Sequence, residues 1–279
     1  WNTKEDGSGQ SYTDGAMVKN LTDEADGIVI LYAQWSGEDD TKYDLWIDGR
    51  RVTSTNAHDV FDDGKVSYDA DTKTLTLSGA NMKYDISDPA ASSYSTGTIY
   101  AESDLVIELA ADTTNTITND LSTGSWNCGI CVSDGDLTIK GTGTLEVTGG
   151  TGYTSHGISV ASGQLIIENG TITAIGQTAQ GVSGIYAYEG INIEGGTVTA
   201  IAYKVSEGST AYSQGLESGY LETITISGGE VVAMGESFAI NKAPSTEMNI
   251  TASTDVSGTP TVDYVKGDIL KYKYIKIEY

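Results

Sequence analysis

One short unit of sequence recurs from about residue 97 almost to the end of the chain. Each copy combines a Gly-Ile strand, a second strand of alternating apolar residues, a glycine-rich corner and a Thr-Val or Thr-Ile strand. The first strands are anchored by apolar residues about 24 to 31 positions apart, namely Ile99, Ile130, Ile158, Ile185, Leu216 and Ile240. A repeat of this length without a helical stretch is typical of a solenoid, in which successive coils stack.

The strand pattern inside each copy predicts how the coils are built. The second strand is apolar at positions i and i+2, as in Leu105/Ile107, Leu137/Ile139, Leu165/Ile167, Ile191/Ile193, Ile224/Ile226 and Met248/Ile250. A period of two residues indicates a strand with one buried face. Such short strands bury that face only against neighbouring coils. The sequence therefore predicts an all-β fold, a parallel β-helix with three sheets, and the rule for parallel crossovers favours a right-handed one.

The segments outside the coils predict the domain organisation. A run of apolar residues ends at Trp35 and is followed by acidic residues, so we place a boundary between a module at 1–36 and the β-helix at 37–279. Because exposed sheet edges invite aggregation, both ends of the rod need covers. We expect an N-terminal cap over 43–79 and closing strands over 262–279. The sequence starts without a methionine, and we expect it to be part of a longer chain.

Charge and composition argue against several classes of partner. The chain has 15 Lys and Arg residues against 39 Asp and Glu residues, a net charge of −24, which would repel nucleic acid. No stretch approaches the ~18 apolar residues of a membrane span, so we expect no membrane insertion. We also expect the chain to be a monomer. Cys128 and Cys131 lack the second pair that a structural zinc site requires. We interpret both as ordinary strand residues.

The N-terminal module resembles a known repeat. Its matching motifs are Trp1-Asn2-Thr3-Lys4, Asp6-Gly7-Ser8-Gly9, Tyr12 and Leu31-Tyr32-Ala33-Gln34-Trp35. They resemble the second half of a Listeria–Bacteroides repeat, a small β-module of bacterial surface proteins. The resemblance implies an extracellular protein that is secreted or attached to a bacterial cell surface.

The start of the β-helix resembles a second family. The run from Tyr43 to Ser54, with Leu45-Trp46-Ile47 and Asp48-Gly49, and the run from Asp63 to Leu77 resemble the N-terminal cap of clostridial surface carbohydrate-binding domains. These domains are β-helices similar to pectate lyases and are regarded as non-catalytic. The resemblance implies calcium sites and binding of cellulose or acidic plant polysaccharides. It does not identify the calcium ligands of this chain.

Aromatic residues in the loops before the first strands are candidate carbohydrate-binding residues. Tyr94, Trp126, Tyr153 and Tyr212 each precede the anchoring residue by four or five positions. In a stacked solenoid, similar offsets would place these rings on one face at about 4.8 Å per coil. Sugars stack their apolar faces on such rings. In the alternative interpretation, the rings cover loop backbone and have no ligand.

Clustered carboxylates are candidate calcium ligands. Asp59, Asp62 and Asp63 lie close together in the expected cap. Calcium takes six to eight oxygen ligands, often from such clusters. The alternative is an ordinary turn, because Asp bonds its own backbone and tolerates the left-handed conformation. We expect bound calcium, with these three residues as the first candidates.

Enzymatic alternatives find little support in the sequence. A pectate-lyase-like elimination commonly uses an arginine base, but Arg50 and Arg51 both lie in the expected cap. His58 and His156 lack a nucleophile partner at a recognisable motif, and we interpret both as surface residues. We therefore predict a non-enzymatic, calcium-assisted carbohydrate-binding or adhesive domain. The alternatives are a structural stalk, a segment that binds a host protein, or a polysaccharide lyase or hydrolase.

Overall fold

The chain divides into two compact units, Trp1–Asp40 and Thr41–Tyr279. The computed structural model describes residues 1–6, 8–12, 16–19, 21–22, 27–33, 40–84, 96–203, 212–219, 222–256 and 262–278. Within these residues, no helix has the length and hydropathy needed to cross a membrane. Tyr94 lies outside the described residues.

The first unit is held together around Asn2. Its backbone exchanges two hydrogen bonds with the backbone of Tyr32, and its side-chain oxygen accepts the N–H groups of Lys4 and Gly9. Asn2 also forms an isolated antiparallel bridge with Ser11. The identity of this unit as a Listeria–Bacteroides repeat stays a prediction.

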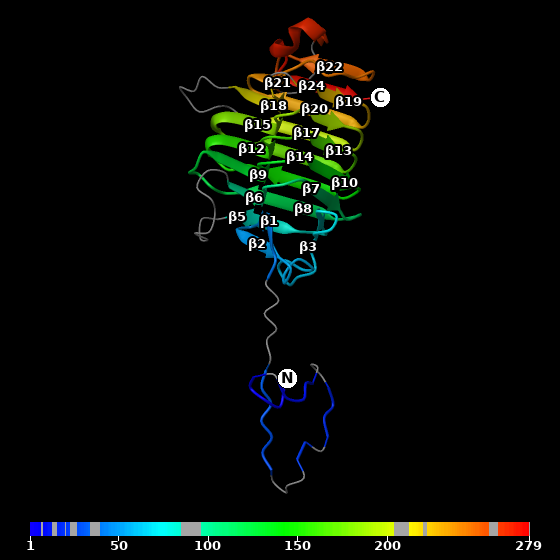
Figure 1. Ribbon diagram of the computed structural model, residues 1–279. Coiled ribbons are helices and arrows are strands. Elements are labelled where there is room, and N and C mark those ends of the chain that lie inside the picture. Colours follow the sequence, from blue (N-terminus) through cyan, green and yellow to red (C-terminus); the bar gives the residue numbers. More distant parts are fainter. Residues whose placement is uncertain are drawn as a thin grey trace. The chain divides into compact units, whose positions relative to one another are not determined.

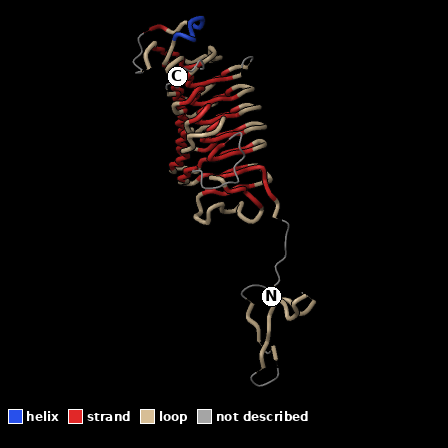
Figure 2. The backbone as a smooth tube through the Cα atoms, turned by 90° about the vertical axis from the view of Figure 1, so that its left-hand side faces the viewer, coloured by secondary structure: helices blue, strands red, loops and turns tan. Residues whose placement is uncertain are grey.

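The second unit is a parallel β-solenoid with three sheets, in which strands of successive coils lie one above another (Figures 1 and 2). The first sheet has the order β2 (Arg50–Thr53), β1 (Lys42–Ile47), β6 (Thr96–Ala101), β9 (Trp126–Val132), β12 (Gly152–Val160), β15 (Ala179–Ala187), β18 (Ser213–Ser218) and β21 (Phe238–Ile240). The second has the order β19 (Ile224–Ile226), β16 (Ile191–Ile193), β13 (Leu165–Ile167), β10 (Leu137–Gly141), β7 (Leu105–Leu109), β4 (Thr74–Leu77) and β3 (Val66–Asp69). The third has the order β23 (Val262–Asp263), β22 (Asn249–Ser253), β24 (Tyr274–Glu278), β20 (Glu230–Gly235), β17 (Thr197–Ala202), β14 (Thr171–Gly176), β11 (Thr144–Thr148), β8 (Thr114–Asn119) and β5 (Asn81–Tyr84). The predicted fold class is confirmed.

The core consists of columns of apolar side chains that run from coil to coil. In the first sheet, Ile130 is in register with Ile99 on one side and Ile158 on the other, and the column continues to Ile240. All of its members are fully buried. Burying one such side chain contributes about 1.5–3 kcal/mol relative to leaving it exposed. The predicted column is therefore confirmed.

Antiparallel hairpins cover the N-terminal end of the solenoid. β1 and β2 are joined at Asp48 and Gly49, which both have positive φ angles of 49° and 76°. An Asp-Gly pair of this kind suits a two-residue hairpin turn, because glycine adopts positive φ without steric cost. β3 and β4 form a second hairpin, and β4 then continues as a parallel neighbour of β7.

The C-terminal end departs from the predicted coil pattern. β24 pairs antiparallel with both β20 and β22, and a 3-10 helix, η1 (Lys266–Lys271), precedes it. The prediction that Met248 and Ile250 continue the second sheet is wrong, because Ile250 lies in β22 of the third sheet. Ser245 extends the second sheet by a single bridge to Thr225.

Glycines allow the first and third sheets to approach each other closely. A Cβ atom on Gly157 would lie 2.5 Å from the backbone nitrogen of Ile175 and 2.7 Å from the carbonyl oxygen of Gly184. The same close approach to backbone atoms recurs along the first sheet at Gly129, Gly184 and Gly215. These positions require glycine because any side chain would meet the neighbouring backbone.

We expect Gly157→Ala to destabilise the solenoid by about 1–3 kcal/mol, the usual cost of inserting a methyl group into a filled interior. Gly267→Ala is the matched control, because an added Cβ there meets nothing within 4 Å. Urea denaturation should show a lower free energy of unfolding for the first variant and a near-native value for the second. Equal stabilities would contradict this packing argument.

Candidate functional site

A bend in the first sheet brings residues three positions apart onto the same outer face. Cys128 and Cys131 of β9 form a disulfide with their Cα atoms 5.6 Å apart. In a straight strand, residues three apart would be separated by about 10 Å and would point to opposite faces. The chain therefore bends between them, at Gly129 and Ile130. The interpretation of both cysteines as strand residues is confirmed, and their bond to each other was not predicted.

The following coils repeat this arrangement in polar residues. His156, Ser183 and Gln214 are in register with one another on one side of the bend. On the other side, Ser159, Tyr186 and Glu217 are likewise in register. The bend lies between these two columns in each coil, at the glycines that contact the third sheet. The two columns thus form the sides of a groove that crosses β12, β15 and β18, which are stacked in Figure 1.

The groove contains a cavity of about 370 Å³. Aromatic, polar and carboxyl side chains share its wall, and its described lining residues are Trp126, Thr154, His156, Gly181, Val182, Ser183, Tyr186, Tyr212, Gln214 and Glu217. We refer to this cavity as the bend groove.

Aromatic rings gather around one part of the bend groove. The ring centroids of Trp126 and His156 are 5.6 Å apart, and so are those of His156 and Tyr186. Trp126 meets Tyr186 edge-on at 6.1 Å. Tyr212 packs against the ring of Phe238 with a centroid distance of 4.9 Å. Rings in mutual contact hold one another in place, so the groove offers preformed surfaces for stacking.

The predicted row of aromatic residues is only partly present. Trp126 and Tyr212 both line the bend groove, and they belong to one column that passes through Thr154 and Gly181. Tyr153 precedes Thr154 by one residue, does not line the groove and is 58% exposed. Tyr153 lies five residues before its anchoring Ile158, whereas Trp126 and Tyr212 lie four residues before theirs. Because adjacent strand residues point to opposite faces, this difference of one residue places Tyr153 in the neighbouring column. The expected row of one ring per coil is therefore wrong.

His156 is buried, which corrects its interpretation as a surface residue. It is 5% exposed, and neither ring nitrogen has a hydrogen-bond partner. Burial lowers the pKa of its imidazole from 6.5 to about 4, so the ring is neutral at pH 7. The ring packs against those of Trp126 and Tyr186, which contact each other as well, and these contacts explain its burial. His58, by contrast, is exposed as predicted.

Glu217 is the carboxyl group of the bend groove, and sequence reasoning missed it. Burial raises the pKa of this carboxyl above its ordinary value, against the opposing effect of hydrogen bonds from Ser183 and Gln214. The Ser183 hydroxyl donates to its Oε2 atom. Its position in the repeat could have identified it from the sequence. Glu217 directly follows the anchoring Leu216, as Tyr186 follows Ile185 and Ser159 follows Ile158.

The predicted calcium ligands lie in a turn between β2 and β3. The carboxylate of Asp59 accepts the backbone N–H groups of Asp63 and Gly64, and Asp62 adopts a positive φ of 59°. Asp63 accepts the N–H of Lys65 and lies 3.4 Å from its ammonium nitrogen. These contacts match the alternative turn role. Within the described ranges, no group of three or more His, Cys, Asp or Glu side chains is arranged to hold a metal. Calcium binding stays a prediction.

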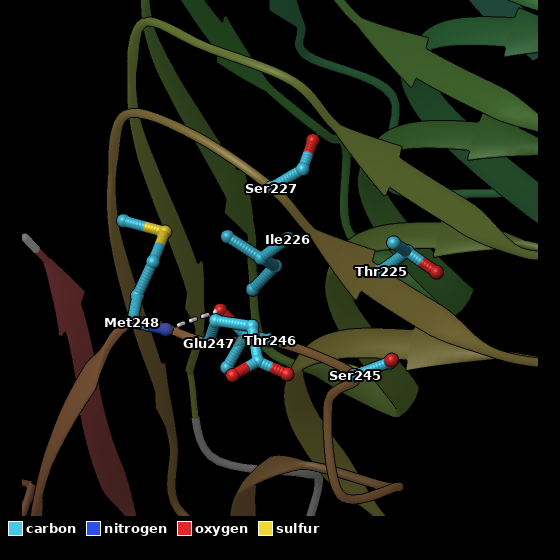
Figure 3. Close-up of a pocket in the computed structure, with 7 residues that line it drawn as sticks. All are labelled: Thr225, Ile226, Ser227, Ser245, Thr246, Glu247 and Met248. Carbon is cyan, nitrogen blue, oxygen red and sulfur yellow. Dashed lines mark hydrogen bonds between the residues drawn. The ribbon is translucent and has the colours of Figure 1, made fainter.

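A second hollow of about 290 Å³ lies at the C-terminal edge of the second sheet (Figure 3). It is lined by the segments 225–227 and 245–248, and the N–H of Met248 donates to the hydroxyl of Thr246. None of these lining residues is aromatic, and Glu247 is exposed to water. The hollow lacks stacking surfaces, so the bend groove is the stronger candidate.

The comparisons with known proteins bear on the ligand of this solenoid. Residues 38–264 match the model of a family described as carbohydrate-binding domain-containing protein. The chain belongs to this family. The match covers most of the chain and includes every residue of the bend groove. No curated protein and no solved structure matches the chain.

The burial of His156 in this carbohydrate-binding domain predicts a pH dependence of stability. Its folded-state pKa of about 4 lies below the ordinary value of 6.5, so the unfolded chain binds the proton more readily. Stability should therefore fall as the pH falls from about 7 towards 4. Between pH 7 and pH 5 this group alone costs about 2 kcal/mol. The raised pKa of Glu217 has the opposite effect, because it makes stability rise as the pH falls. Glu217 is present in the wild type and in the His156 variant described next, so its effect cancels in the comparison.

The measurement is the free energy of unfolding of the wild type and of His156→Gln at pH 7 and pH 5. The difference between the proteins should shrink at the lower pH, because the variant has no imidazole to protonate. Parallel pH profiles would contradict the buried neutral state of His156.

Proposed function

We propose that the chain is a non-enzymatic, extracellular carbohydrate-binding domain and that the bend groove holds the glycan. The observation that carries this proposal is the combination of Trp126 and Tyr186 rings with buried, unpartnered polar groups in one cavity. Aromatic rings and hydrogen-bonding groups are the two features that a sugar requires, since it has apolar faces and polar edges. Membership of a carbohydrate-binding family supports the same function.

The groove suits a chain of sugars rather than an isolated one. Its side chains come from β9, β12, β15 and the segment around β18, so the groove crosses several coils. Coils are spaced by about 4.8 Å, the distance between neighbouring strands. A polysaccharide that runs along the stacked coils would meet new lining residues in each coil. We therefore propose a polysaccharide ligand.

The composition of the lining supports binding rather than catalysis. Glycosidases use a pair of carboxyl groups on either side of the scissile bond. Of the described residues that line the bend groove, Glu217 carries a carboxyl group, and the others are neutral at pH 7. The arrangement therefore favours a binding site over a hydrolase.

The disulfide supports the extracellular part of the proposal. Disulfides form and persist mainly in oxidising compartments such as the cell surface. The Cys128–Cys131 bond lies in β9, directly beside the bend groove. Calcium assistance remains a prediction from the sequence resemblance, and a calcium titration monitored by thermal unfolding would test it.

We expect Trp126→Ala and Tyr186→Ala each to lower affinity for a bound polysaccharide about tenfold, through the loss of a stacking surface. Tyr153→Ala is the matched control, because Tyr153 does not line the cavity. It lies one residue before Thr154, which is in register with Trp126. A glycan array identifies the ligand, and titration calorimetry then measures the three variants.

Three outcomes would contradict the proposal. Equal losses in all three variants would remove the bend groove from the account. An array without any bound glycan would favour a structural stalk or a segment that binds a host protein. Release of shortened or unsaturated products would instead identify an enzyme.

A further inference from the structure

The bend groove contains several buried polar atoms that have no partner. Both ring nitrogens of His156 and the Oε1 atom of Gln214 are buried in its lining without a hydrogen bond, and so is the hydroxyl of Ser159, which is in register with Tyr186 but does not line the cavity. Across the described part of the chain, these make up four of the five such side-chain atoms. A buried polar atom without a partner costs about 1–3 kcal/mol. A ligand that supplies the missing partners at this place recovers part of that cost.

The missing partners are mainly donors. Gln214 Oε1 is an acceptor, and a neutral imidazole offers one acceptor nitrogen in addition to its N–H group. The Glu217 carboxylate is also an acceptor, and its two oxygens have room for a ligand donor beside the hydrogen bonds from Ser183 and Gln214. The groove thus presents acceptor groups in two of its coils, with Gln214 Oε1 and the Glu217 carboxylate together in β18. The complementary ligand group carries several N–H or O–H donors at one point.

The charge of the groove points to a cation. Glu217 is partly buried, and no lysine or arginine is present in the described lining. An uncompensated carboxylate away from water is costly, and a cation placed beside it removes most of that cost. A uronate would instead bring a like charge to Glu217 on a chain whose net charge is already −24.

The aromatic rings are placed to receive the same cation. Trp126, Tyr186 and Tyr212 line the cavity together with Glu217, and Trp126 and Tyr186 are in edge-on contact. The faces of Trp and Tyr rings attract ammonium groups, more strongly when the site is dry. Rings combined with a carboxylate and amide oxygen form a site for an ammonium group with three donors.

We infer that the bend groove selects amino sugars that carry a free ammonium group, in preference to neutral sugars and uronates. This inference rests on the proposed function and names its ligand class. The ammonium group donates to Glu217 and Gln214, which both lie in β18, while rings of the same sugar chain stack on Tyr186 and Trp126 in the preceding coils. A neutral sugar offers stacking and hydroxyl donors, but it leaves the carboxylate without a counter-charge.

Titration calorimetry of the full chain with four hexasaccharides tests this inference. The probes are the oligomers of glucosamine, N-acetylglucosamine, glucose in β-1,4 linkage and galacturonate, and hexalysine serves as an ammonium-bearing peptide. The glucosamine oligomer should bind at least tenfold more tightly than the N-acetylated one. Tighter binding of hexalysine would overturn the assignment to a sugar.

Two isosteric variants separate a specific site from general attraction to an acidic protein. Glu217→Gln should lose at least tenfold in affinity for the glucosamine oligomer, and the preference for this oligomer over the N-acetylated one should disappear. Glu189→Gln removes an equal charge from an exposed position in the adjacent turn and should keep the preference. Thermal unfolding of both variants checks that they fold.

The outcomes distinguish this inference from the proposed function. Equal or tighter binding of neutral oligomers would overturn the amino-sugar preference and leave the proposed function intact. Equal losses in Glu217→Gln and Glu189→Gln would likewise overturn it, because the attraction would then be general. Binding of none of the saccharides would count against both.

Discussion

The close contact between the first and third sheets determines the shape of the outer surface. At Gly157 the two sheets are so close that a single Cβ atom would overlap the backbone of Ala174 and Ile175 in the third sheet. The strand can approach this far only by bending, and the bend turns two outward side chains per coil towards each other. In β9 these two side chains are bonded as the Cys128–Cys131 disulfide. In the next coils they are the polar residues of the bend groove.

Stability and function are separated between the two faces of the same strands. The inner face carries columns of fully buried apolar residues such as Ile130, Ile158 and Ile185. Each contributes a favourable burial energy of about 1.5–3 kcal/mol. The outer face of the same strands carries polar atoms whose missing partners cost about 1–3 kcal/mol each. The redundant core tolerates this cost, and a ligand that satisfies those atoms recovers part of it on binding.

Much of the fold follows from the sequence because the repeat is local and its core is periodic. Apolar residues at i and i+2, followed by a glycine corner, identify each coil without knowledge of its neighbours. The site depends on contacts that are distant in sequence. Gly157 must be glycine because of Ile175, 18 positions later, and the burial of His156 follows from that bend. The predicted row of aromatic residues was wrong for a local reason. Side chains four and five residues before the anchoring residue point to opposite faces of the strand.

At the C-terminal end, a competing interaction overrides the repeat pattern. Met248 and Ile250 have the spacing of a second strand, yet β22 gains antiparallel partners on β24 along its whole length. Local spacing carries no information about which distant strand is available for pairing. The disulfide was missed likewise, because a Cys-x-x-Cys spacing in a strand predicts opposite faces unless the bend is known.

The central claim is that glycine-induced bending creates the glycan site. A crystal structure of the chain with a bound oligosaccharide tests it most directly. The account predicts electron density for sugar rings between the two columns, in contact with Trp126 and Tyr186. Density over the exposed rings of Tyr153 or Tyr188, with the bend groove filled by water alone, would contradict it.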